Sequence, residues 1–292
     1  MRLYKNECGG FIVKVGTVFW HRSGASFVEE FDFYRDAGFD GVEVTISETS
    51  EPIQSLSARG YLRIESLFDD AEKLIEASRE TGLEIHSVRG GLLWKYPLNS
   101  LDPSVRDRAF RIVEKGLEVT NRLGATGLLL VPAVVMEETP YEETYQLVLQ
   151  AIRKLSRKAE EEGVYLCIEN VENNFLLSPL EMRRFVDDVG SDMVGVYLDV
   201  GNVLARYQSY PQHWIRILGG RIKKVHLKDY CERTKSITYL LQGDVNWPEV
   251  IRSLKSIGYK DYLTAELQPY KLFPEKFFKH LADVIRELVI SL

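Results

Sequence analysis

Short apolar runs rich in β-branched residues alternate with longer amphipathic stretches along this sequence, and the alternation restricts the fold more than any other feature. The amphipathic stretches repeat their apolar residues with the period of a helix. Several short runs are apolar almost throughout, which is typical of parallel strands covered on both faces. The runs number eight, over residues 11–19, 41–46, 83–88, 127–131, 164–169, 194–199, 223–228 and 262–266.

Glycines mark the ends of the predicted helices. Five amphipathic stretches end at glycine, at Gly38, Gly82, Gly124, Gly163 and Gly258. Glycine is favoured just past a helix because that position often takes the left-handed backbone conformation. A predicted strand begins within a few residues of each, so the repeating unit is helix, glycine, strand.

Eight such units predict a closed (β/α)₈ TIM barrel. No linker rich in Pro, Gly or Ser divides the chain, and we therefore expect one domain over residues 1–292. The alternative is a doubly wound open sheet, which usually carries a glycine-rich phosphate turn after an early strand. Neither GxGxxG nor GxxxxGK[ST] occurs in the sequence.

Composition narrows the class of protein. Hydrophobic residues make up 45% of the chain and charged residues 27%, which is ordinary for a folded protein. The net charge of −6 argues against a surface that neutralises nucleic-acid phosphates. Three widely spaced cysteines, no signal peptide and no apolar run near the roughly 20 residues of a membrane span predict a cytoplasmic protein.

Polar residues end four consecutive late runs. Glu169, Asp199, His226 and Glu266 each follow an apolar strand pattern, about one β/α unit apart, with a longer gap before the last. In a barrel the carboxyl ends of the strands meet at one mouth, which is where function resides. Three carboxylates and one imidazole form a hard, oxygen-rich ligand set, suited to Mn²⁺ first, with Mg²⁺, Co²⁺ or Zn²⁺ as alternatives.

Each of these residues also has a purely structural interpretation. Glu169 and Glu266 fit buried salt-bridge partners, Asp199 fits a cap for the following turn, and His226 fits a satisfied core histidine. Together, however, the four would repel one another or go unsatisfied without a cation. The joint pattern therefore favours a metal site.

These motifs resemble the xylose-isomerase-like barrel superfamily of sugar isomerases and epimerases, particularly the ketose 3-epimerases and the hexulose or pentulose phosphate isomerases and epimerases. The resemblance spans nearly the whole chain. The most specific motifs are CIEN at 167–170, LDVGN at 198–202, VHLKD at 225–229, GDVNW at 243–247 and TAE at 264–266.

The resemblance implies that Glu169, Asp199, His226 and Glu266 bind a catalytic metal and that Glu169 and Glu266 form the acid/base pair. A cation at the carbonyl and neighbouring hydroxyl of a sugar stabilises the enediolate formed on loss of a carbon-bound proton. Return of the proton to the opposite face gives epimerisation, and a shuttle between adjacent carbons gives aldose–ketose isomerisation. The expected partner is a small sugar or sugar phosphate, with a slight preference for a free ketose because no phosphate cradle is evident.

Three further residues are candidate substrate contacts, each with a competing structural role. His86 lies near the end of the third strand, Lys228 shares a strand face with His226, and Asn202 stands where many ketose epimerases have a substrate-binding histidine. His86 also fits a structural histidine, and Lys228 an ion pair with a ligand carboxylate. Glu43, in the second strand pattern, is expected in a structural ion pair more than in the cavity.

Two loops are candidate walls of the site, residues 20–22 after the first strand and 90–97 after the third. Packing against a neighbouring subunit is the alternative for 90–97. Related barrels form dimers or tetramers, which predicts a homo-oligomer.

Rival functions remain open. A dehydratase of a cyclic keto-polyol also begins by removing a proton beside a carbonyl, and a catalytically silent sugar-binding barrel would retain the fold. A metal-dependent apurinic endonuclease needs a histidine-rich zinc site, whereas this chain has five histidines and an acidic balance.

Overall fold

Eight parallel strands close into a barrel in the computed structural model, which describes residues 12–22, 24–48, 61–206 and 208–291. Neighbouring strands pair in parallel all the way round, and the pairing of the first and second strands closes the circle. The strands are β1 (Lys14–Val18), β2 (Gly41–Ser47), β4 (Glu84–Arg89), β5 (Gly127–Leu130), β6 (Tyr165–Glu169), β7 (Val194–Asp199), β8 (Ile222–Leu227) and β11 (Tyr262–Ala265). The predicted barrel and its eight strands are confirmed.

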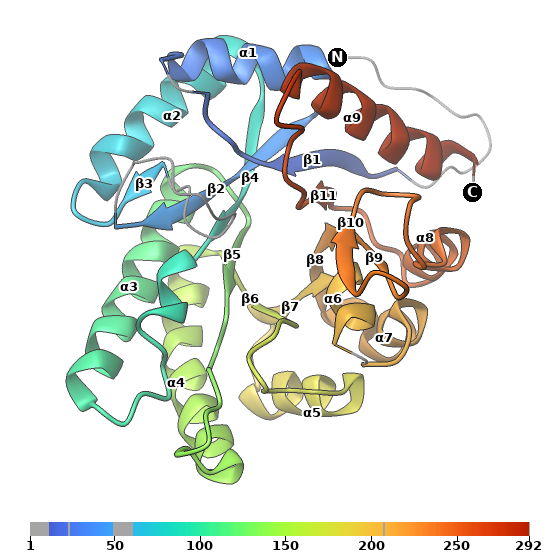
Figure 1. The fold of residues 1–292 in the computed structure, drawn as a ribbon. Coiled ribbons are helices and arrows are strands. Elements are labelled where there is room, and N and C mark those ends of the chain that lie inside the picture. The colour runs from blue at the N-terminus through green and yellow to red at the C-terminus, as the bar shows by residue number, and fades with distance from the viewer. Residues whose placement is uncertain (1–11, 23, 49–60, 207, 292) are drawn as a thin grey trace.

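Helices surround the strands on the outside (Figure 1). Their apolar faces cover the barrel because every strand would otherwise expose one apolar face to water. The helices are α1 (Phe27–Ala37), α2 (Leu67–Thr81), α3 (Pro103–Arg122), α4 (Tyr141–Glu162), α5 (Pro179–Val189), α6 (Val200–Ala205), α7 (Pro211–Leu218), α8 (Trp247–Ser256) and α9 (Pro274–Ser291). The last helix packs beside the first, so the two ends of the described chain close the outer ring.

Local signals account for several helix boundaries. Ser26 caps α1 in a reciprocal capping box with Glu29. Gly38, Gly82 and Gly163 take positive φ angles just past α1, α2 and α4, as the sequence predicts. Each helix therefore stops where the next strand must begin.

Short elements outside the barrel were not predicted. The strand β3 (Leu62–Arg63) extends the sheet beside β2, and β9 (Asp229–Cys231) pairs with β10 (Ser236–Thr238) as an antiparallel hairpin. The hairpin lies in the long gap between His226 and Glu266, which explains why that spacing exceeds one β/α unit. Among the described residues, no helix has the length and apolar character needed to cross a bilayer.

The barrel interior is polar as well as apolar. His86 stacks on Tyr262, with ring centroids 3.9 Å apart and planes 11° apart. A methyl group at Gly16 of β1 would lie 2.6 Å from His86 Nε2 and 3.0 Å from the ring of Tyr262. Gly16 therefore provides the space that this stacked pair occupies.

We expect Gly16→Ala to lower the free energy of unfolding by about 1–3 kcal/mol, because a buried stacked pair must shift to admit the methyl group. Urea unfolding measures the difference. The control is Gly220→Ala, since an added methyl group there meets nothing within 4 Å. Equal stability of the two variants would contradict the packing described for Gly16.

Candidate metal centre and its surroundings

The four predicted ligands converge at the carboxyl ends of β6, β7, β8 and β11. These strands are consecutive neighbours in the barrel, with Asp199 in register with His226. One ligand atom from each of Glu169, Asp199, His226 and Glu266 lies within 4.8 Å of the others, and all four residues are buried. The closed sheet thus places four side chains, far apart in sequence, around one point.

The two ring nitrogens of His226 face different partners. Nδ1 lies 3.3 Å from Glu169 Oε1 and 3.5 Å from Glu266 Oε2, within the ligand set. Nε2 lies 2.8 Å from Glu43 Oε1, outside it. A ligand histidine commonly donates its second N–H to a carboxylate, which fixes the ring and its tautomer. The geometry suits Nδ1 as the ligand atom.

Glu43 is buried completely and has a second donor. Tyr197 of β7 donates its hydroxyl hydrogen to Glu43 Oε2 at 2.5 Å. Arg89 Nε also lies 3.6 Å from Glu43 Oε1. Glu43 is thus the ion-paired residue that the sequence predicts, and its partner is the histidine of the site.

Two cations balance the carboxylates at this end of the barrel. Lys228 Nζ lies 2.8 Å from Asp199 Oδ2 and 2.7 Å from Glu266 Oε2. Arg89 Nη2 lies 2.7 Å from Glu266 Oε1. Both oxygens of Glu266 are therefore held, one by each cation.

The pKa values at His226 and Asp199 reflect this crowding. Burial opposes charging of His226, but Glu43 and Glu266 outweigh it and raise its pKa to about 10. Burial raises the pKa of Asp199 to about 7, against the opposing attraction of Lys228. Without an ion, the histidine is itself one of the cations of the site.

The two glutamates differ from each other. Burial raises the pKa of Glu169 above its usual value, an effect that its hydrogen bond to His226 only partly offsets. At Glu266 burial acts in the same direction, but Lys228 and Arg89 outweigh it and hold the pKa well below its usual range. A pair of carboxyls with divergent pKa values is typical of acid/base sites.

The donor set fits a divalent ion with a preference for oxygen and imidazole nitrogen. Three carboxylates and one imidazole nitrogen already lie within mutual reach of one position. Lys228 is the side chain that such an ion would compete with, because its ammonium contacts two of the three carboxylates. Cys167 is the cysteine nearest in sequence to a predicted ligand. It lies two residues before Glu169 on β6, deeper in the barrel.

The structure separates the three predicted substrate contacts. Lys228 lies at the site, in the ion pairs expected as its alternative role. Asn202 lies next to the site, in α6. The Asn202 side chain donates a hydrogen bond to the carbonyl of Asn170 at 2.8 Å. This bond ties the start of α6 to the end of β6, next to Glu169.

His86 is not brought to this site. It is the third residue of β4 and accepts, through its backbone carbonyl, a hydrogen bond from Lys224 Nζ at 3.0 Å. Lys224 precedes His226 by two residues on the same strand, so both side chains point into the barrel. Lys224 and His86 lie nearer the amino-terminal end than His226 does. The expectation that His86 lies near the end of its strand is wrong, because β4 continues to Arg89.

Arg89 and Tyr197 are the site residues that the sequence did not reveal. Arg89 ends β4 as Glu169 ends β6, so the same rule of polar strand ends identifies it. Tyr197 lies within β7 and carries no comparable signal. Of the predicted loop walls, the second contains the turn Gly91–Trp94, and Tyr96 anchors it by donating to Glu48 at 2.6 Å.

Comparisons with known proteins agree with this architecture. The chain is 28% identical to SgbU of Escherichia coli (strain K12) over 252 residues, which are 83% of this chain and 84% of that protein. It is 23% identical over 237 residues to the L-ribulose-5-phosphate 3-epimerase UlaE of Escherichia coli O157:H7 (strain EC4115 / EHEC), covering 81% of this chain and 80% of that protein.

The fold is shared with the crystal structure of apo 3-keto-D-glucoside 4-epimerase YcjR from E. coli, with a TM-score of 0.75 and 17% identity over 94% of this chain and 99% of that one. The family model for the xylose isomerase-like TIM barrel matches residues 31–288. The chain belongs to the xylose isomerase-like TIM barrel family.

Proposed function

We propose that this protein is a divalent-metal-dependent epimerase of a ketose or ketose phosphate. The observation that carries the proposal is the approach of Glu169 and Glu266 to one point from strands β6 and β11, which two other strands separate. A binding protein has no need of two such carboxylates. The relationship to UlaE, named an L-ribulose-5-phosphate 3-epimerase, supports the substrate class.

The reaction requires removal of a weakly acidic proton beside a carbonyl. One of the two glutamates takes the proton, which leaves a cis-enediolate, and the other returns a proton to the opposite face with inversion at that carbon. A divalent ion held by Glu169, Asp199, His226 and Glu266 would supply the positive charge that stabilises the enediolate. If one glutamate serves both carbons, the same residues perform aldose–ketose isomerisation.

Other residues of the chain hold this pair in place. Lys228 and Arg89 contact the two oxygens of Glu266 and favour its ionised form. Asn202 and Asn170 join the ends of β6 and β7, where Glu169 and Asp199 lie. Precise placement of reacting groups accounts for much of enzymatic rate enhancement.

Several finer features stay predictions. We expect Mn²⁺ as the ion, with Mg²⁺, Co²⁺ or Zn²⁺ as alternatives, and a dimer or tetramer in the cytoplasm. Of the substrate contacts, we retain Lys228 and Asn202, which lie at the site. The exchange experiment below distinguishes a free from a phosphorylated ketose. It includes ketose phosphates because UlaE is named for a phosphorylated ketose.

We expect solvent deuterium to enter a ketose or ketose phosphate only when metal-stripped protein is restored with Mn²⁺. Glu169→Gln and Glu266→Gln each remove one proton-transfer group, so exchange should fall by about 10²–10⁴-fold. Nuclear magnetic resonance of the recovered sugar measures the exchange and locates the deuterium.

Glu72→Gln is the matched control, since Glu72 lies on α2 and pairs with Arg122 at the surface. Exchange that survives both active-site substitutions would refute the proposed acid/base pair. Release of a dehydrated product would indicate the keto-polyol dehydratase, and sugar binding without exchange across the panel would indicate a silent barrel.

Glu43 should govern the affinity for the metal without touching it. Glu43→Ala removes the acceptor for His226 Nε2, so we expect Mn²⁺ affinity to fall by about 10–100-fold. Glu43→Gln keeps an acceptor and should lose less. Isothermal titration calorimetry measures the affinities, and circular dichroism confirms folding. Equal affinity of wild type and both variants would contradict this role.

A further inference from the structure

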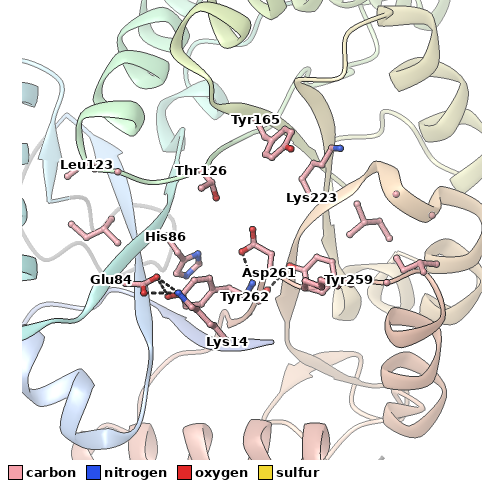
Figure 2. Close-up of a pocket in the computed structure, with 18 of the residues that line it drawn as sticks. Lys14, Glu84, His86, Leu123, Thr126, Tyr165, Lys223, Tyr259, Asp261 and Tyr262 are labelled. Atoms are coloured by element: carbon pink, nitrogen blue, oxygen red, sulfur yellow. Dashed lines mark hydrogen bonds and ion pairs between the residues drawn. The ribbon is translucent and has the colours of Figure 1, made fainter. Parts of the chain in front are cut away.

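A hollow of about 650 Å³ lies at the amino-terminal end of the barrel. Residues at the starts of strands line it, among them Lys14 of β1, Glu84 of β4, Tyr165 of β6 and Tyr262 of β11 (Figure 2). The metal ligands end their strands, so the hollow is at the opposite end of the barrel. Its volume lies within the range of small-molecule sites.

The carboxylates that line the hollow are already paired. Glu84 accepts hydrogen bonds from Lys14 Nζ at 2.6 Å and from the Tyr262 hydroxyl at 2.7 Å. Asp261 accepts one from the buried Lys224 Nζ at 2.9 Å. Neither carboxylate therefore offers an unbalanced negative charge to a ligand.

Two lysines at the same hollow have no such partner. Lys223 and Lys260 line it, and within the described ranges neither forms an ion pair with a carboxylate. The ammonium of Lys223 lies 4.8 Å from the centre of the Tyr165 ring. The hollow therefore has an excess of positive charge, which favours an anion.

Uncharged polar groups complete the lining. Thr126 and Tyr165 bring hydroxyl groups to the lining, and the buried Nδ1 of His86 has no hydrogen-bond partner among the described residues. Figure 2 shows Thr126, His86, Asp261, Tyr165 and Lys223 arranged around this space. Hydroxyl groups and aromatic rings in the lining suit a ligand that itself carries hydroxyl groups.

We propose that this hollow binds a small polyhydroxylated anion, with Lys223 and Lys260 facing its charged group and Thr126 and Tyr165 hydrogen-bonding its hydroxyls. The charged group is a phosphate or a carboxylate, both of which accept hydrogen bonds from ammonium groups. The site is separate from the metal centre, and its occupant need not be the substrate.

Isothermal titration calorimetry with D-glucose 6-phosphate, D-gluconate and D-glucose tests the proposal. We expect at least one of the two anions to bind and the uncharged sugar to bind more weakly. The preferred anion identifies the charged group as phosphate or carboxylate. Failure of both anions to bind in the millimolar range would overturn the proposal.

Variants locate the binding. Lys223→Ala should weaken it about tenfold, and Thr126→Trp should block it by filling the hollow from an exposed position. Lys154→Ala, at an exposed position on α4, is the matched control and should bind normally. Asp199→Asn alters the metal centre and should also bind normally.

Binding that persists in both Lys223→Ala and Thr126→Trp, or that disappears in Asp199→Asn, would overturn the proposal. Loss in Asp199→Asn would place the anion at the metal centre instead. Because this experiment needs no turnover, its result is independent of whether the protein is an epimerase. Thermal unfolding of each variant confirms that lost binding is not lost folding.

Discussion

The structure depends on the burial of four carboxylates at one end of a closed barrel. Glu43, Glu169, Asp199 and Glu266 are all at most 7% exposed, and a buried carboxylate is costly unless it is paired. Closure of the sheet forces them together, because the strands that carry them end at the same mouth. Lys228, Arg89 and His226 compensate for their charge.

The kind of compensation differs from one carboxylate to another. Glu43 is satisfied permanently by Tyr197 and His226, whereas Asp199 and Glu266 share the ammonium of Lys228. The flexible side chain of a lysine such as Lys228 can move away from these carboxylates. The hydrogen bonds of Glu43, which join buried and packed groups, cannot easily rearrange. The arrangement thus combines a fixed histidine with carboxylates whose counter-charge is exchangeable, as a metal site needs.

The opposite end of the barrel has the reverse character. There the buried Lys224 pairs with Asp261, and Glu84 accepts a hydrogen bond from Tyr262. Lys223 lies over the ring of Tyr165 and forms no ion pair with a carboxylate of the described residues. His86 lies between the two ends, with Nε2 3.4 Å from the hydroxyl of Thr264. The proposed cation site and the proposed anion site therefore lie at opposite ends of one barrel, the first at the carboxyl ends of its strands and the second at their amino ends.

The sequence predicts much of this and misses the rest for physical reasons. Helix periodicity and terminal glycines predict the β/α order, and polar strand ends predict the four side chains that converge at the carboxyl ends of β6, β7, β8 and β11. His86 lies in the middle of β4, three residues before Arg89, and an apolar run does not reveal which of its residues reach the mouth of the barrel. The β9–β10 hairpin lies within a segment whose polarity resembles a loop. The pairing of Glu43 with His226 joins residues 183 positions apart, and only barrel closure specifies such a contact.

The central claim is that Glu169, Asp199, His226 and Glu266 form a metal site. Calorimetry tests it most directly, by titrating the metal-stripped protein with Mn²⁺ at several pH values between about 6 and 9. His226, with a pKa raised to about 10, is protonated throughout this range and must lose its proton before Nδ1 can bind an ion. We predict one ion per chain, proton release on binding, and an apparent association constant that rises about tenfold per pH unit near pH 8. Absence of stoichiometric binding, or an affinity independent of pH, would contradict the account.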